Sequence, residues 1–304
     1  MLTSRKLGWI GIGRMGHAMA ERLAKAGCDL TVWNRTRAKA EPLAKLGVKI
    51  ASRPADLAGC DIVFVVVSTG QDVMEMVEAL CAGGRAPKVV VDSTSISIED
   101  SERVRQRLAA AGAQLLAAPV SGNAKVIQAG KLTFVCSGPR PAFDAAEPYL
   151  GLMGSGASYV GEGELSRIAK ICHNVYLGIV IQALAEITLL AQKAGMSRHA
   201  FLDFLNRSVM GSTFSRYKTP ALVNLDFRVT FTPRLLRKDL DLGLDAARAL
   251  EVPMPLATLT RELVQAMIGH GMTEKDFSEL LVLQARASGL ELQPENVEVG
   301  DGLS

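Results

Sequence analysis

The chain has 304 residues, of which 48% are hydrophobic and 21% charged, with a formal net charge of +3 at pH 7. This length suggests two domains, and the composition is typical of a globular enzyme. No basic stripe, no metal-binding cysteine spacing and no clustered histidines are present, so we expect neither nucleic-acid binding nor a metal site.

The N-terminal residues 1–6 lack the apolar region of a signal peptide. The five cysteines form no C-x-x-C pair, and most lie in apolar runs, so reduced, buried thiols are the simplest interpretation. We therefore expect a cytoplasmic protein.

A glycine pattern follows the first strand-like run. Gly11, Gly13 and Gly16 match the G-x-G-x-x-G pattern of dinucleotide-binding βαβ units. Gly11 would allow the tight turn, Gly13 would let the backbone approach a pyrophosphate, and Gly16 would let the helix pack against the strand. Such turns can serve packing alone, but a helical pattern and a second strand at 29–33 complete the unit. The predicted cofactor residues of this turn are Gly11, Ile12, Gly13, Arg14, Met15 and Gly16.

The residues after the second strand bear on the choice of cofactor. An acidic side chain there holds the ribose 2′-hydroxyl of NAD(H), but this chain has Asn34-Arg35-Thr36-Arg37. Arg35 can present a planar donor fork to a 2′-phosphate, and Asn34 and Thr36 add neutral donors. Arg35 and Arg37 could also be solvated surface charges. We predict that NADP(H) is preferred, with NAD(H) as a possible cofactor.

Further apolar runs alternate with helical segments. Residues 62–67 are continuously apolar, as a central parallel strand is, and we expect Val67 and Ser68 at its end to contact the cofactor. More strands are expected at 89–92, 114–118 and 132–136, and a short one at 158–160. This alternation predicts an α/β Rossmann domain with a doubly wound sheet over residues 1–164.

The pattern becomes helical from residue 165 onward. A stretch without proline covers 165–194 and is apolar on most sides, so we expect it to be buried. Its most apolar part, 171–185, is too short and too polar for a membrane helix. Further helices are expected at 198–207, 235–250, 255–269 and 275–288. They predict an all-α domain built on one long helix over residues 165–290, followed by a loose tail, 291–304.

A long helix that is apolar on several sides needs more cover than one small helical domain provides. We therefore expect a homodimer or a homotetramer, in which such helices pack together.

Three segments carry groups suited to hydride-transfer chemistry, which needs a proton donor and groups that hold the substrate. Ser121, Gly122 and Asn123 follow a strand, and their hydroxyl and backbone N–H groups could take a carboxylate, although an ordinary polar turn has the same composition. Lys238 could reach the cofactor or the substrate, or could belong to a surface charge cluster.

Lys170 and Asn174 are four residues apart on the long helix and share a face. Burial in a cleft would lower the pKa of Lys170 toward a value useful for proton transfer. A lysine that extends to the surface is the common alternative. We expect His173, next to Asn174, to be structural.

Taken in order, these segments resemble the β-hydroxyacid dehydrogenase family, the 3-hydroxyisobutyrate dehydrogenase-like group with NADP binding of the 6-phosphogluconate dehydrogenase type. The matching motifs are Gly11-Ile-Gly-Arg-Met-Gly16, Asn34-Arg-Thr36, Asp92-Ser-Thr-Ser95, Pro119-Val-Ser-Gly122, Gly161-x-Gly163 with Lys170-x-x-x-Asn174, and Lys238-Asp239. The resemblance implies an active site between the two domains. It implies that Lys170 is the general acid/base and that Ser121, Gly122 and Asn174 hold the substrate. It places Ser95 near cofactor and substrate, and Lys238 near the nicotinamide.

Two departures from the family pattern concern the substrate. Asn123 stands where the family has a second glycine, and His173 stands where it has the first of two asparagines. The resemblance predicts an NAD(P)-dependent dehydrogenase of a small β-hydroxyacid, or a reductase of the matching semialdehyde. The alternatives are an imine reductase on the same scaffold, against which Lys170 argues, and a catalytically silent NADPH-binding module.

Overall fold

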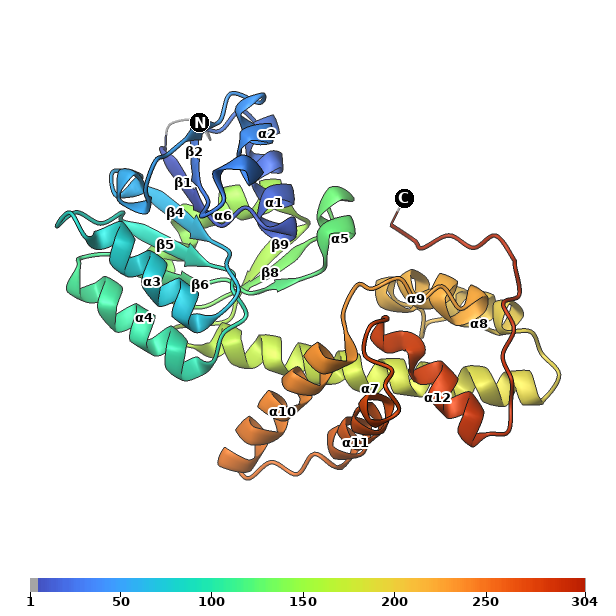
Figure 1. Cartoon of the computed structure of the whole chain (residues 1–304). Helices are drawn as coiled ribbons and strands as arrows, with labels where there is room; N and C mark the ends of the chain where they lie inside the picture. Colours follow the sequence, from blue (N-terminus) through green and yellow to red (C-terminus); the bar gives the residue numbers. More distant parts are fainter. Residues whose placement is uncertain (1–4, 304) are drawn as a thin grey trace. The chain divides into compact units, whose positions relative to one another are not determined.

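The computed structural model describes residues 5–303 (Figure 1). Residues 1–4, within the N-terminal segment interpreted above, and residue 304 of the predicted tail lie outside the described residues. The chain divides into two compact units, Met1–Lys170 (unit 1) and Ile171–Ser304 (unit 2).

Unit 1 is built on a six-stranded sheet in the order β3-β2-β1-β4-β5-β6. The strands are β1 (Leu7–Ile10), β2 (Leu30–Trp33), β3 (Lys49–Ile50), β4 (Ile62–Val65), β5 (Val89–Asp92) and β6 (Gln114–Ala117). Every neighbouring pair is parallel. The chain therefore runs outward from β1 on one side and from β4 on the other, which is the doubly wound order of a Rossmann fold and confirms the predicted fold class.

Alternate residues of the central strands face opposite sides of this sheet. On β4, Ile62 and Phe64 join one buried cluster, whereas Val63 and Val65 join another. Side chains of α1 and α6 contribute to the first cluster, and side chains of α3 and α4 to the second. Both faces are covered, which explains why the strands read as continuous apolar runs. The unit's helices are α1 (Arg14–Lys25), η1 (Arg37–Lys39), α2 (Glu41–Ala44), η2 (Pro54–Leu57), α3 (Gly70–Cys81), α4 (Ile98–Ala110), α5 (Ala124–Gln128) and α6 (Arg140–Met153).

Two of the expected strands do not extend the main sheet. β8 (Thr133–Cys136) and β9 (Gly156–Tyr159) form a second sheet with β7 (Val120–Ser121), in the order β7-β8-β9. β7 runs antiparallel to β8, and β9 runs parallel to it. Pro119 lies between β6 and β7, and it has no N–H to donate to a strand ladder. An isolated bridge between Ala117 and Ser137 links the end of β6 to the segment after β8.

Unit 2 is all-helical, as predicted. Its elements are α7 (Leu165–Lys193, which begins in unit 1), α8 (Arg198–Arg207), α9 (Thr213–Asn224), α10 (Pro233–Ala249), α11 (Pro255–Gly269), η3 (Phe277–Glu279) and α12 (Leu280–Ala287). Helix α9 was not predicted, because it contains Pro220 and several hydroxyl side chains that weaken a helical pattern. The Ser212 side chain accepts the N–H of Ser215 and so caps the start of this helix.

The long helix α7 is long and apolar enough to cross a membrane by length and composition. This qualifies our expectation, which considered only residues 171–185. A core helix meets the same criteria, and α7 places Val175, Ile181, Leu184 and Leu189 in the buried cluster of unit 2. Burial among other helices therefore accounts for part of its apolar character.

The C-terminal tail is not loose, contrary to our expectation. The Glu295 carboxylate accepts hydrogen bonds from the N–H groups of Arg198 (2.7 Å) and His199 (2.9 Å) at the start of α8. The buried Arg198 guanidinium donates in turn to the carbonyl of Gln293 (2.6 Å). The tail is held in part because Glu295 satisfies backbone N–H groups at the start of α8 that have no partner within the helix.

Candidate cofactor and active site

A cavity of about 440 Å³ lies in unit 1 and is lined by residues from the ends of β1, β2 and β4. The predicted cofactor residues that line it are Gly11, Gly13, Arg14, Met15, Gly16, Asn34, Arg35, Thr36, Val67 and Ser68. The other lining residues, which sequence reasoning missed, are Trp33, Lys39, Val66, Asp72 and Met76. Ligands of doubly wound sheets bind at this point, where the strand order reverses.

The surroundings of the three glycines in the turn show what a larger side chain would meet at each position. Gly11 has φ +98°, and a Cβ there would lie 2.0 Å from the carbonyl oxygen of Val66. A Cβ at Gly16 would lie 2.0 Å from the carbonyl oxygen of Gly11, so the helix can pack closely only with glycine at that position. An added Cβ at Gly13 would meet no atom within 4 Å. The space beside Gly13 is thus open to a ligand.

The start of α1 is suited to an anion. Its N-cap is Gly13, which makes no side-chain cap hydrogen bond, and its first turn holds no acidic residue. The first N–H groups of the helix and the helix dipole can therefore act on a phosphate. Together with the open space beside Gly13, this arrangement fits a dinucleotide cofactor.

Asn34, which lines the cavity, also makes two hydrogen bonds to backbone groups. Its Oδ1 accepts the N–H of Ile12 (2.8 Å), and its Nδ2 donates to the carbonyl of Thr36 (2.8 Å). The side chain therefore links the glycine turn to the loop after β2. Ile12 is buried and is not among the lining residues.

Two cations line the cavity near the predicted 2′-phosphate position. Arg35 Nη2 lies 3.3 Å from both Asp72 Oδ1 and Glu75 Oε2, and the Arg35 side chain is 68% exposed. The second cation is Lys39, which lies at the end of η1 and lines the cavity. Arg37 is exposed and is not a lining residue.

Asp72, the acidic residue that lines the cavity, has a pKa below its usual value. The main cause is the hydrogen bond that the Thr69 hydroxyl donates to its carboxylate.

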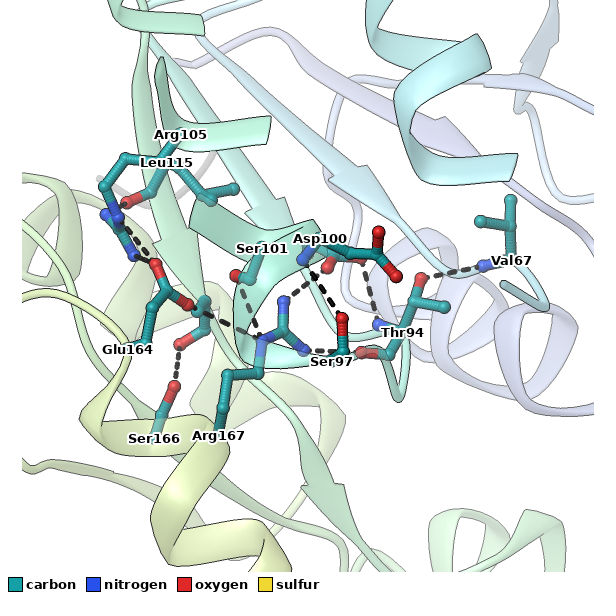
Figure 2. Close-up of polar contacts among 12 residues, drawn as sticks. Val67, Thr94, Ser97, Asp100, Ser101, Arg105, Leu115, Glu164, Ser166 and Arg167 are labelled. Atoms are coloured by element: carbon teal, nitrogen blue, oxygen red, sulfur yellow. Dashed lines mark hydrogen bonds and ion pairs between the residues drawn. The ribbon is translucent and has the colours of Figure 1, made fainter. Parts of the chain in front are cut away.

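Figure 2 shows a polar network that begins beside this cavity. The N–H of Val67 donates to Thr94 Oγ1 (3.1 Å), and the N–H of Thr94 donates to Asp92 Oδ1 (3.0 Å). Asp92 Oδ2 accepts Arg167 Nη2 of α7 at 2.5 Å, and both side chains are buried. Ser95, in the same loop, is exposed and is not among the residues that line the cavity.

The same network holds the first turn of α7 within unit 1 (Figure 2). Arg105 donates to the Glu164 carboxylate (2.7 Å) and to the carbonyl of Gly163 (2.8 Å). The Ser166 hydroxyl donates to the carbonyl of Ala117 at the end of β6 (3.1 Å). Lys170 lies one turn after Arg167 on this anchored helix and is partly buried.

The predicted carboxylate-binding segment adopts a turn that begins α5. Gly122 has φ +133°, a conformation that favours glycine. Asn123 Oδ1 accepts the N–H of Val126 (3.2 Å) and caps α5. The asparagine that replaces the family's second glycine therefore stabilises the start of this helix. Ser121 lies in β7, opposite Thr133 of β8.

In unit 2, Asn174 and Lys238 meet at a common partner, Asp239. Asn174 Nδ2 donates to Asp239 Oδ2 (2.6 Å), and Lys238 Nζ lies 3.8 Å from Asp239 Oδ1. His173 Nδ1 lies 3.0 Å from Asn174 Oδ1. Sequence reasoning gave Asp239 no role, although it directly follows Lys238. Cys172, expected to be buried, is exposed.

Comparison with family models assigns both parts of the chain. Residues 6–161 match the NAD binding domain of 6-phosphogluconate dehydrogenase. Residues 164–284 match the NAD-binding domain of NADP-dependent 3-hydroxyisobutyrate dehydrogenase.

Individual relatives include two proteins named as enzymes and one named as a nuclear factor. The chain is 30% identical to glyoxylate/succinic semialdehyde reductase 2, chloroplastic, of Arabidopsis thaliana, over 92% of this chain and 79% of that protein. It is 28% identical to the cytokine-like nuclear factor N-PAC of Homo sapiens over 91% of this chain, and it spans about half of N-PAC (51%). A solved structure of Mycobacterium tuberculosis 3-hydroxyisobutyrate dehydrogenase with L-serine superposes with a TM-score of 0.80 at 27% identity, covering 92% of this chain and 99% of that one.

Proposed function

The chain belongs to the β-hydroxyacid dehydrogenase family, and we propose from this premise that it oxidises a small β-hydroxyacid or reduces the matching semialdehyde. The observation that carries the proposal is the cavity of unit 1, where the glycine turn, the start of α1 and the cations Arg35 and Lys39 line one space. A nicotinamide cofactor fits this arrangement of groups.

The proposed roles of the side chains follow from their chemistry. The nicotinamide, when bound, accepts or supplies the hydride. Lys170 Nζ takes the proton of the substrate hydroxyl in oxidation and returns it in reduction. Asn174, whose amide is fixed by Asp239 at 2.6 Å, orients the reacting oxygen. The Ser121 hydroxyl and the backbone N–H groups of Gly122 and Asn123 hold the substrate carboxylate.

The cofactor proposal is a preference for NADP(H). Arg35 and Lys39 both line the cavity, and a guanidinium can bind a phosphate with two parallel hydrogen bonds. The strand end that would carry an acidic group for NAD(H) carries Asn34 instead, whose amide is committed to backbone groups. The cations and the missing strand-end carboxylate support this preference. Lys238 is proposed to lie near the nicotinamide end of the cofactor.

Absorbance at 340 nm tests substrate class and cofactor together. The purified chain would be assayed with NADPH and NADH against glyoxylate and succinic, methylmalonic and tartronate semialdehydes. NADP⁺ and NAD⁺ would be assayed against 3-hydroxyisobutyrate, serine and related β-hydroxyacids. We expect turnover of at least one member and a lower KM for the 2′-phosphorylated cofactor. Equal KM values for NADPH and NADH would contradict the cofactor preference.

Silence on the whole panel would contradict the proposed activity. If NADPH still bound tightly in that case, the result would favour the catalytically silent binding module. Turnover of cyclic imines in place of the panel compounds would favour the imine reductase.

We also propose that the chain forms a homodimer or a homotetramer. The support is a set of large apolar side chains that unit 2 leaves exposed, including Tyr176, Leu190, Phe204, Val209 and Met210. Apolar surface of this kind is stabilised when a second subunit covers it.

A further inference from the structure

Arg35 is held by two carboxylates of α3. Its Nη2 lies 3.3 Å from Asp72 Oδ1 and 3.3 Å from Glu75 Oε2, and Asp72 also lines the cavity. These residues lie 37 and 40 positions after Arg35 in the sequence. Two carboxylates from another element therefore lie beside the arginine that follows β2.

The two carboxylates differ in what else they do. Asp72 accepts the hydroxyl (2.7 Å) and the N–H (3.1 Å) of Thr69 and so completes the capping box that begins α3. Its removal would disturb the helix start as well as the cavity. Glu75 is 61% exposed, and its ion pair within residues 5–303 is the one with Arg35. Glu75 can therefore be changed with little effect on folding.

We propose that Glu75, with Asp72, lowers the selectivity of the site for NADP(H) over NAD(H) by competing with the 2′-phosphate for Arg35. A phosphate monoester carries about −1.5 to −2 charges at neutral pH. To bind Nη2 of Arg35 it must displace a carboxylate and remain near another negative group. A 2′-hydroxyl requires no such exchange, so the affinity for NAD(H) is insensitive to the pair. Both cofactors then remain usable.

This inference rests on the proposed function only for the class of cofactor, because it concerns binding and not turnover. The test is calorimetric titration of the full chain with NADP⁺ and with NAD⁺, in the absence of substrate. Glu75→Gln removes the charge and keeps the size of the side chain. We expect NADP⁺ to bind about two- to fivefold more tightly, the range for one exposed ion pair. We expect the Kd of NAD⁺ to change by less than about 1.5-fold.

Glu78→Gln is the matched control. Glu78 lies on the same helix, less than one turn after Glu75, and pairs with Arg107 (2.8 Å), which is not a cavity residue. The variant makes the same change in net charge, so its NADP⁺ Kd should equal that of the natural chain. If Glu78→Gln tightened NADP⁺ as much as Glu75→Gln does, a general charge effect would explain the result and the proposal would be overturned.

Arg35→Ala shows whether the effect passes through Arg35. We expect this variant to bind NADP⁺ more weakly, and Glu75→Gln added to it to change the Kd by less than about 1.5-fold. An unchanged or weaker NADP⁺ affinity in Glu75→Gln alone would overturn the proposal. It would also be overturned if Glu75→Gln tightened NADP⁺ binding as much in the Arg35→Ala background as in the natural chain. Failure of the dehydrogenase assay would leave these titrations intact, whereas binding of neither dinucleotide would overturn both proposals.

Discussion

At the scale of single residues, the proposed chemistry depends most on Lys170. Lys170→Ala removes the group that takes or returns the proton, so we expect turnover to fall by about 10²- to 10⁴-fold. The Kd of NADP⁺ should not change, because Lys170 is not among the residues that line the cofactor cavity. Steady-state kinetics on the compound identified by the panel, together with a cofactor titration, measures both quantities.

Two further variants separate proton transfer from charge. Lys170→Arg keeps the positive charge but holds its proton too tightly to exchange it, so it should be nearly as inactive as Lys170→Ala. Lys193→Ala removes an exposed lysine at the far end of the same helix and should retain full activity. Near-normal turnover in Lys170→Ala would refute the assignment of the general acid/base.

What the sequence reveals about single residues depends on how local the constraint is. Gly11 was predicted from the glycine pattern, although the carbonyl oxygen that it approaches belongs to Val66, after β4. Gly16 could be predicted, because its close approach to the carbonyl oxygen of Gly11 arises within one strand, turn and helix. Asp72 and Glu75 could not, because the pairing of β4 beside β1 brings them to Arg35. Asn34 was predicted at the site, but its hydrogen bonds to Ile12 and Thr36 were not, since composition does not show which backbone groups its amide meets.

At the scale of elements, the ion pair of Arg167 with Asp92 fixes the start of α7 against β5. The side chains are 2% and 0% exposed, and the atoms lie 2.5 Å apart. Arg167→Met leaves Asp92 buried without its counter-charge, which costs about 3–5 kcal/mol. We expect a lower midpoint of urea unfolding for unit 1, measured by a probe in that unit such as the fluorescence of Trp9.

Two comparisons check that the unpaired charge is the cause. Arg103→Met removes an exposed arginine that pairs with Asp100, and an exposed pair contributes at most about 1 kcal/mol. The double variant Arg167→Met with Asp92→Leu removes both buried charges and should recover part of the loss. An unfolding midpoint for Arg167→Met that equals that of Arg103→Met would contradict the expected role of the pair.

Elements differ in how far the sequence predicts them. The long helix and the five longer parallel strands have strong hydrophobic patterns, and both were predicted. The separate sheet of β8 and β9 was not, because an apolar run shows that a strand is buried but not which strand it pairs with. Helix α9 was not predicted either, because its start depends on the Ser212 cap and its sequence is polar and contains Pro220.

At the scale of the whole molecule, the surface of unit 2 leads to a prediction about assembly. Leu190 on α7 is 72% exposed and Val209 after α8 is 99% exposed, although both belong to a unit with a well-buried core. Exposed apolar groups of this size cost free energy in water that a second copy of the chain would recover. We expect light scattering at micromolar concentration to give at least twice the mass of one chain.

A charged residue in such an interface would oppose association, because its carboxylate would lose water without gaining a partner. Leu190→Glu should therefore shift the distribution toward single chains. Leu46→Glu makes the same change at an exposed leucine of unit 1 and should leave the mass unchanged. A monomer of the natural chain would exclude the proposed assembly, and an unaltered oligomer in Leu190→Glu would place the interface away from that side chain. In that case Leu256 and Leu259, two exposed leucines on α11, would be substituted next.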